Sequence, residues 1–215
     1  MKRRELKKDE VLWWEGSVAQ SIAVVESGQL GVRNPRGLIG IAFSRTVVGE
    51  SSILTLDGPP ATRKATVFAV TDAAVATEYP AEQVKDAFGV GVPRLVLRTL
   101  FGQICSNALL VLGAHVGHAT LESALMGLIQ GMGQCEKQIK SIRDWPAFMA
   151  AFRMLYELRE ATDRTRDVLV DAARLEPAAI ERASTTARTL FGSGDVAEYL
   201  EQFIRIEADR GRAGA

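Results

Sequence analysis

The sequence predicts an α+β protein, with an antiparallel β region first, then a long helix, then an all-helical remainder. Up to about Thr77 the chain is rich in β-branched residues, glycine and turn signals. After Tyr79 the apolar residues recur with helical spacing. From Ala119 onward every segment has a helical pattern. We therefore expect three regions, at residues 1–92, 93–117 and 118–215.

Turns divide the first region into short strands. Breaks fall at Ser27-Gly28 and at Asn34-Pro35-Arg36-Gly37. Short strands with frequent turns are typical of a barrel, a sandwich or a β-roll. Because successive strand side chains alternate, one of Trp13 and Trp14 should face the core and the other the surface. The expected strands are Val11–Trp14, Ser21–Glu26, Gln29–Arg33, Leu38–Ser44, Thr66–Val70 and Ala74–Tyr79.

Helices are expected throughout the rest of the chain. Pro80 suits a helix start, and a short helix should cover residues 81–88. The helix at 94–115 is apolar on two faces, so it must be buried on two sides. Its heptad seam predicts a partner helix, either from a second chain in a homodimer or from the C-terminal half. The seam consists of Leu97, Phe101, Ile104, Ala108 and Val111, and further helices are expected at 119–143, 145–174, 177–191 and 194–209.

Composition excludes several classes of protein. The 26 Lys and Arg residues balance 26 Asp and Glu residues, so the whole chain has no basic footprint for nucleic acid. No apolar run approaches about 20 residues, so we expect no membrane-spanning helix. The basic N-terminus is not followed by the shorter apolar run of a signal peptide, so we expect no signal peptide and a cytoplasmic protein. Cys105 and Cys135 are expected to be buried free thiols.

Enzymatic chemistry has little support in the sequence. His115, His118 and Glu122 have metal-ligand spacing on a helix, but we interpret the two histidines as helix-end residues beside a glycine, and we expect no metal and no cofactor. No P-loop and no Ser/His/Asp arrangement is present. We therefore expect a non-enzymatic protein.

One constellation has the composition of a ligand site. The stretch Gly49-Glu50-Ser51-Ser52 is followed after a loop by Arg63-Lys64-Ala65-Thr66. A buried arginine can bind a phosphate with its planar set of donors, and backbone N–H groups of a short helical turn can complete the cradle. A carboxylate can accept a sugar hydroxyl, and a preceding glycine lets the backbone approach closely. These are the groups that a cyclic nucleotide requires.

From about Leu6 to His115 the sequence resembles the cyclic-nucleotide-binding domains of the cyclic-AMP receptor protein, protein kinase A regulatory subunits and cyclic-nucleotide-gated channels. Glu15-Gly16 matches the first turn of these domains, and Val24-Val25-Glu26-Ser27-Gly28-Gln29-Leu30 matches a hairpin. Gly49-Glu50 and Arg63-Lys64-Ala65-Thr66 match the ends of the phosphate-binding cassette. The helices at 81–88 and 94–115 match the B and C helices.

The resemblance implies a jelly-roll-like antiparallel β-roll and a set of ligand contacts. Glu50 would accept the ribose hydroxyl, and Arg63 would bind the phosphate. Gly49 and backbone groups of Ser51, Ser52, Lys64 and Ala65 would complete the cradle, and Ser106 or Asn107 of the C helix would contact the base. The ligand would be cyclic AMP, cyclic GMP or a cyclic dinucleotide.

Three departures from the family leave alternatives open. The loop between Glu50 and Arg63 is longer than usual and contains Asp57-Gly58-Pro59-Pro60. Ser44-Arg45-Thr46 replaces a glycine-containing turn, and Lys64 replaces a small residue. The chain is thus predicted to be a cyclic-nucleotide sensor that signals to a protein partner, and the first alternative is a ligand-free scaffold.

The second alternative is a transcription regulator, which many bacterial relatives of the family are. The segment 171–196 faintly resembles a helix-turn-helix, with Ser184-Thr185-Thr186 and Arg188 on the second helix. No glycine marks the turn, and residues 145–215 hold 10 Arg against 12 acidic residues, a net charge of −2. A surface that binds phosphates should be basic, so we do not expect DNA binding.

Overall fold

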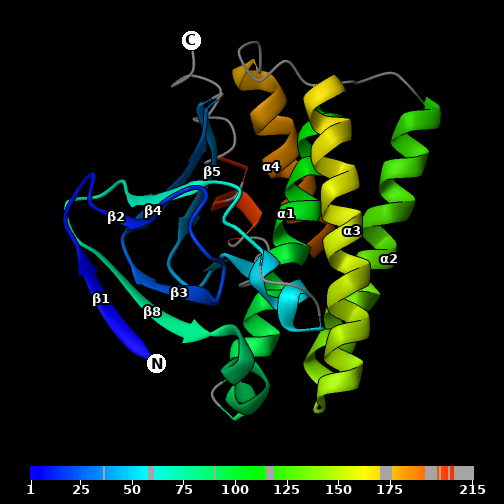
Figure 1. Ribbon diagram of the computed structural model, residues 1–215. Coiled ribbons are helices and arrows are strands. Elements are labelled where there is room, and N and C mark those ends of the chain that lie inside the picture. Colours follow the sequence, from blue (N-terminus) through cyan, green and yellow to red (C-terminus); the bar gives the residue numbers. More distant parts are fainter. Residues whose placement is uncertain are drawn as a thin grey trace. The chain divides into compact units, whose positions relative to one another are not determined.

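The computed structural model describes residues 1–35, 37–57, 61–89, 91–114, 119–169 and 176–191, together with 198, 200–202, 204 and 205 (Figure 1). Packing divides the chain into two compact units. The first comprises Met1–Val96 and Arg143–Phe148, and the second comprises Leu97–Ile142 and Met149–Ala215. The three regions expected from the sequence stay a prediction.

Two four-stranded antiparallel sheets form most of the first unit. One sheet has the order β1 (Lys2–Leu6), β8 (Ala74–Pro80), β3 (Ser21–Ser27) and β6 (Val47–Val48). The other has the order β2 (Val11–Trp13), β7 (Thr66–Ala69), β4 (Gln29–Asn34) and β5 (Gly37–Phe43). All six strands expected from the sequence are confirmed, and so is the α+β class.

The core of this unit draws small and β-branched side chains from both sheets. Alternation buries one face of each strand, which explains why Trp13 packs partly against the core while Trp14 is 62 % exposed. The core residues are Leu6, Leu12, Ala23, Val25, Leu30, Ala42, Val48, Val67, Ala69, Ala74 and Ala76.

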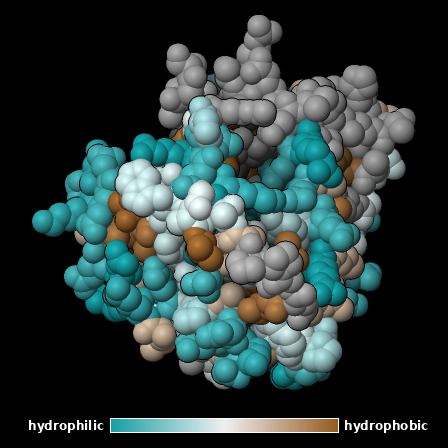
Figure 2. All heavy atoms as spheres, in the orientation of Figure 1, coloured by the Kyte–Doolittle hydropathy of each residue, from teal (hydrophilic) through white to brown (hydrophobic). Residues whose placement is uncertain are grey.

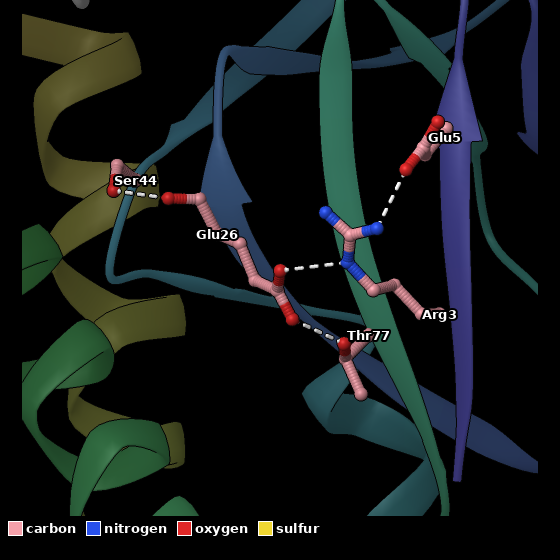
Figure 3. Close-up of polar contacts among 5 residues, drawn as sticks. All are labelled: Arg3, Glu5, Glu26, Ser44 and Thr77. Carbon is pink, nitrogen blue, oxygen red and sulfur yellow. Dashed lines mark hydrogen bonds and ion pairs between the residues drawn. The ribbon is translucent and has the colours of Figure 1, made fainter.

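Strand β1 was not expected because its sequence, KRREL, is mostly charged. It pairs only with β8 in the sheet, and charged side chains are usual on such edge strands. Arg3 links it to β3 by donating from Nε to Glu26 Oε2 at 3.2 Å, and within β1 it donates from Nη1 to Glu5 Oε1 at 2.5 Å (Figure 3). The Thr77 hydroxyl donates to Glu26 Oε1 at 2.5 Å, and this bond, followed by the one from Arg3, lowers the pKa of Glu26.

Strand β6 was also missed, because it has only two residues, Val47 and Val48. The turn before it contains the departure from the family that the sequence showed. Arg45 has a φ of 66°, in the left-handed region that non-glycine residues rarely adopt. Thr46 holds the turn, since its hydroxyl donates to the Phe43 carbonyl at 2.6 Å and accepts from the Phe43 N–H at 3.0 Å.

The helices follow the expected order. The 3₁₀ segment η2 covers Ala81–Phe88, and α1 covers Val92–Ala114. The second unit continues with α2 (Ala119–Ser141), α3 (Trp145–Leu169) and α4 (Pro177–Phe191), the first residues of α3 belonging to the first unit. The described residues between 198 and 205 are helical, as expected for 194–209.

Helix α1 bears on two expectations from the sequence. By length and composition it could cross a membrane, with a mean hydropathy of 1.6, although we expected no such segment; 78 % of that window is buried, and core helices pass the same test. The five seam residues, from Leu97 to Val111, are at most 2 % exposed within the single chain. A homodimer through this seam stays a prediction, and it would first require the seam to become exposed.

Several expectations concern residues that lie outside the described part of the structure. His115, His118, Pro59 and Pro60 lie there, as do residues 171–175 and 192–197 of the segment that resembles a helix-turn-helix. The side chains of Glu122 and Cys135 are also outside it, whereas Cys105 is a buried free thiol, as expected.

The visible surface of the chain is mostly hydrophilic, and its hydrophobic residues form small separate areas (Figure 2). The described residues include six exposed large apolar side chains: Met1, Trp14, Val18, Ile39, Leu54 and Met154.

Candidate functional site

The site begins where β6 ends and the 3₁₀ segment η1 (Glu50–Asp57) starts. Gly49 joins them with a φ of 77°. Ser52, which is fully buried, donates from its backbone N–H to the Gly49 carbonyl at 3.0 Å. Its hydroxyl lies 2.8 Å from the Gly49 carbonyl and 3.1 Å from the Ser21 carbonyl. Ser52 therefore ties the first turn of η1 to the start of strand β3.

Arg63 is held on the other side of this site by its backbone. Its N–H donates to the Ser17 carbonyl at 2.7 Å, and its carbonyl accepts from the Gly16 N–H at 2.9 Å. The neighbouring residue Thr62 forms a bridge with Val18. These bonds fix the Cα of Arg63 beside the turn after β2, so that its side chain enters the unit from a defined point.

The guanidinium of Arg63 is buried, with the residue only 6 % exposed. Nη2 donates to the Ser21 carbonyl at 2.8 Å and lies 3.1 Å from the Ser21 hydroxyl. The guanidinium carbon lies 3.5 Å from the centroid of the Trp13 ring. Nε and Nη1 are buried and have no hydrogen-bond partner among the described residues.

Burial lowers the pKa of Arg63 to about 10. Charge attraction from Glu78 and from Glu50 opposes that shift. The side chain therefore remains a cation at neutral pH, and it has two nitrogens whose donors are unsatisfied. Buried donors in this state are uncommon, because leaving one unpaired is unfavourable.

Gly49 provides the space for this arrangement. A Cβ at this position would lie 2.5 Å from Arg63 Nη1 and 2.8 Å from Trp13 Cζ3. It would also lie 3.2 Å from the Ser21 carbonyl oxygen. From the sequence, Gly49 was expected to lie next to a ligand. The structure shows in addition that the absence of a Cβ at Gly49 makes room for the guanidinium of Arg63.

Most of the predicted site residues belong to the first unit. Gly49, Ser52 and Arg63 meet around Ser21, and Glu50 is close enough to act on the charge of Arg63. Ser51 and Ala65 are half-buried, whereas Lys64 is exposed. The assigned ligand roles of these residues stay predictions.

Ser106 and Asn107 belong to the second unit, and both already have partners within the helices. The Ser106 hydroxyl donates to the Gln103 carbonyl at 3.0 Å. Asn107 Nδ2 donates to Asp163 Oδ1 of α3 at 2.6 Å. The expected contact of either residue with a base stays a prediction, and these bonds would have to change or be shared.

Three residues of the site were not found from the sequence: Trp13, Ser21 and Glu78. Trp13 Nε1 donates to Glu78 Oε1 at 3.1 Å, which connects the stacked ring to strand β8. The sequence showed that one tryptophan of the pair would face inward, but spacing along the chain does not show which buried cation it meets. Ser21 acts largely through its backbone carbonyl, which has no signal in the sequence.

Comparison with known proteins finds a family match within this unit. Residues 3–89 match the family model of the cyclic nucleotide-binding domain. Among solved structures, the N-terminal domain of a transcriptional regulator from Streptomyces coelicolor is 23 % identical, with a TM-score of 0.35, and the match covers 46 % of this chain and 72 % of that one.

Two further solved structures are similar to a comparable share of the chain. A cyclic nucleotide-binding-like protein from Brucella abortus is 16 % identical, with a TM-score of 0.33, covering 41 % of this chain and 75 % of that one. An EAL enzyme in its cAMP-bound form is also 16 % identical, with a TM-score of 0.34, covering 42 % of this chain and 24 % of that one. No curated protein matches the chain.

Proposed function

Because residues 3–89 form a cyclic nucleotide-binding domain, we propose that this chain is a non-enzymatic sensor that binds a cyclic nucleotide and signals through its helical half to a protein partner. The ligand is cyclic AMP, cyclic GMP or a cyclic dinucleotide. A fold does not by itself fix a ligand, so the proposal depends on the chemistry of the site.

The observation that supports it is the state of Arg63. This cation is 6 % exposed, and its Nε and Nη1 have no hydrogen-bond partner among the described residues. A phosphate supplies both what the group lacks, namely negative charge and acceptor oxygens, and charge-assisted bonds of this kind are among the strongest in proteins.

Glu50 fits the second half of the ligand. It is half-buried at the start of η1, directly after Gly49, and its charge acts on Arg63. A carboxylate there can accept a ribose hydroxyl while the guanidinium holds the phosphate. Signalling then requires that the ligand bind one arrangement of the following helices better than another.

Isothermal titration calorimetry tests the proposal on the full chain. Cyclic AMP, cyclic GMP and cyclic di-GMP are titrated into the wild type and into Arg63→Ala. We expect heat from at least one ligand with the wild type, and a loss of affinity of about 100-fold or more in the variant, the amount typical of a charged group left without its partner. No heat from any of the three with the wild type would refute the proposal.

A ligand-free scaffold is the second candidate, and one observation favours it. Ser21 and Trp13 already hold part of the guanidinium without any ligand. For a scaffold, Arg63→Ala would leave every interaction of the helical half unchanged, and no nucleotide would raise the melting temperature of the wild type. A thermal-shift series with the same three nucleotides therefore separates the two candidates.

A further inference from the structure

The partners of the Arg63 guanidinium have an unusual composition. A buried cation is commonly paired with a carboxylate. Here, among the described residues, the groups in direct contact with it are neutral: the Trp13 ring and Ser21. Glu50 and Glu78 contribute attraction only over a longer range.

A ring and a carboxylate hold a guanidinium in different ways. A carboxylate accepts from the N–H groups at the edge, and it would then compete with a phosphate for the same donors. An aromatic ring contacts the face, so it attracts the cation without using any N–H group. The stack at 3.5 Å on Trp13 thus keeps Arg63 in place and leaves Nε and Nη1 free of partners among the described residues.

The ring is itself held in place. Trp13 Nε1 donates to Glu78 Oε1 at 3.1 Å, and Trp13 also packs partly against the core between the sheets. On the side of η1, Gly49 leaves the space that ring and guanidinium share. The adjacent Trp14 is 62 % exposed and serves as a natural comparison for the same residue type.

We infer that Trp13 is a positioning residue: it holds Arg63 by the face of its guanidinium, so that the buried edge donors stay unpaired until the phosphate group of the ligand replaces the groups that cover them. This role rests on the proposed function, because it assigns to Trp13 the task of preparing the phosphate site before the ligand arrives. Ser21 fixes the rotation of the guanidinium through Nη2, and Trp13 fixes its plane.

Three variants of the full chain test this role. Trp13→Leu removes the ring face, Trp13→Phe keeps an aromatic face without the bond to Glu78, and Trp14→Leu is the matched control. Two measurements are made on each. NMR follows the Nε–H signal of Arg63, assigned with Arg63→Lys, which the ring current of a stacked indole shifts upfield. Calorimetry measures the Kd for cyclic AMP and cyclic GMP.

We expect Trp13→Leu to return the Nε–H signal to the usual range and to raise the Kd about 10-fold to 30-fold, as the loss of a desolvated cation–π contact implies. Trp13→Phe should retain most of the affinity, and Trp14→Leu should match the wild type in both measurements. If Trp13→Leu does not fold, Trp13→Met provides the same comparison with a longer and more adaptable apolar side chain.

Two results would overturn the role of Trp13: an unchanged Nε–H signal in Trp13→Leu, or an unchanged Kd. A Trp13→Phe variant as weak as Trp13→Leu would also overturn it and would assign the effect to the bond with Glu78. If the wild type binds neither nucleotide, nor cyclic di-GMP, the proposed function fails, while the NMR comparison still decides whether Trp13 sets the position of Arg63.

Discussion

Replacing Gly49 by alanine tests how tightly the site is built. Gly49 has a φ of 77°, and an L-residue in this left-handed region costs about 1–2 kcal/mol. The new Cβ would also lie 2.5 Å from Arg63 Nη1, 2.8 Å from Trp13 Cζ3 and 3.2 Å from the Ser21 carbonyl oxygen. Overpacking of this kind adds about 1–3 kcal/mol. The free energy of unfolding should therefore fall by about 2–5 kcal/mol.

The chain contains a control for the backbone part of this cost. Gly16 has a φ of 79°, but a Cβ there would meet nothing within 4 Å. Gly16→Ala should thus lose only the conformational part, about 1–2 kcal/mol. In a chain of this size each kcal/mol lowers the melting temperature by roughly 2–4 °C. The difference between the two variants then measures the crowding of the new Cβ against Arg63, Trp13 and Ser21 together.

Thermal melts and calorimetry on the two variants complete the experiment. Because the guanidinium is the part that can move, Gly49→Ala should also weaken nucleotide binding, whereas Gly16→Ala should leave the affinity unchanged. If the two variants melt at the same temperature and bind nucleotide equally well, then the guanidinium does not occupy the space beside Gly49 and the described site is wrong.

Three further predictions concern single side chains. Arg63→Met should abolish nucleotide binding while leaving the melting temperature equal or higher, because an incompletely paired buried cation is replaced by an apolar group of similar length; a lower melting temperature would contradict this. Arg45→Gly should raise the free energy of unfolding by up to about 1 kcal/mol in a denaturant titration, since it relieves the φ of 66°; no gain would show that the turn is unstrained. Thr77→Val should raise the pKa of Glu26 in an NMR titration, because it removes the hydrogen bond that contributes most to its depression. Because the pKa of Glu26 is lower in the folded state than in the unfolded state, its ionised carboxylate stabilises the protein at pH values above the unfolded-state pKa. That contribution is lost as the pH falls through the folded-state pKa, so Thr77→Val should lose less stability in acid than the wild type does.

The sequence predicted those parts of the fold that depend on local pattern. Each strand with alternating apolar residues was found, from Val11–Trp13 to Ala74–Pro80, as was the 3₁₀ segment Ala81–Phe88. Strand β1 was missed because it is defined by its pairing with β8 and not by an alternating apolar pattern of its own. Long-range pairing of this kind is outside what a local pattern can show.

The residues of the candidate site likewise fall into those that a local pattern predicts and those that it does not. Gly49, Glu50 and Arg63 were found because their types and spacing follow from the chemistry of a phosphate and a sugar. Trp13 lies 50 positions before Arg63 in the chain, and the two meet only because strand β2 and the loop before β7 come together. A residue that acts on another residue, and not on the ligand, leaves no motif.

The magnitudes at Arg63 bear on the choice between a sensor and an empty scaffold. Each buried donor left unpaired costs about 1–3 kcal/mol. Two nitrogens of Arg63, Nε and Nη1, have no hydrogen-bond partner among the described residues. The stack on Trp13 returns about 0.5–2 kcal/mol, and the bond to Ser21 about 1 kcal/mol or somewhat more. Together these contacts return about 1.5–3 kcal/mol or somewhat more against a cost of about 2–6 kcal/mol, so the two ranges overlap, and the melting temperature of Arg63→Met measures which is larger. An anion that accepts from Nε or Nη1 would satisfy these donors, and this is the ground on which we propose a phosphate ligand for the site.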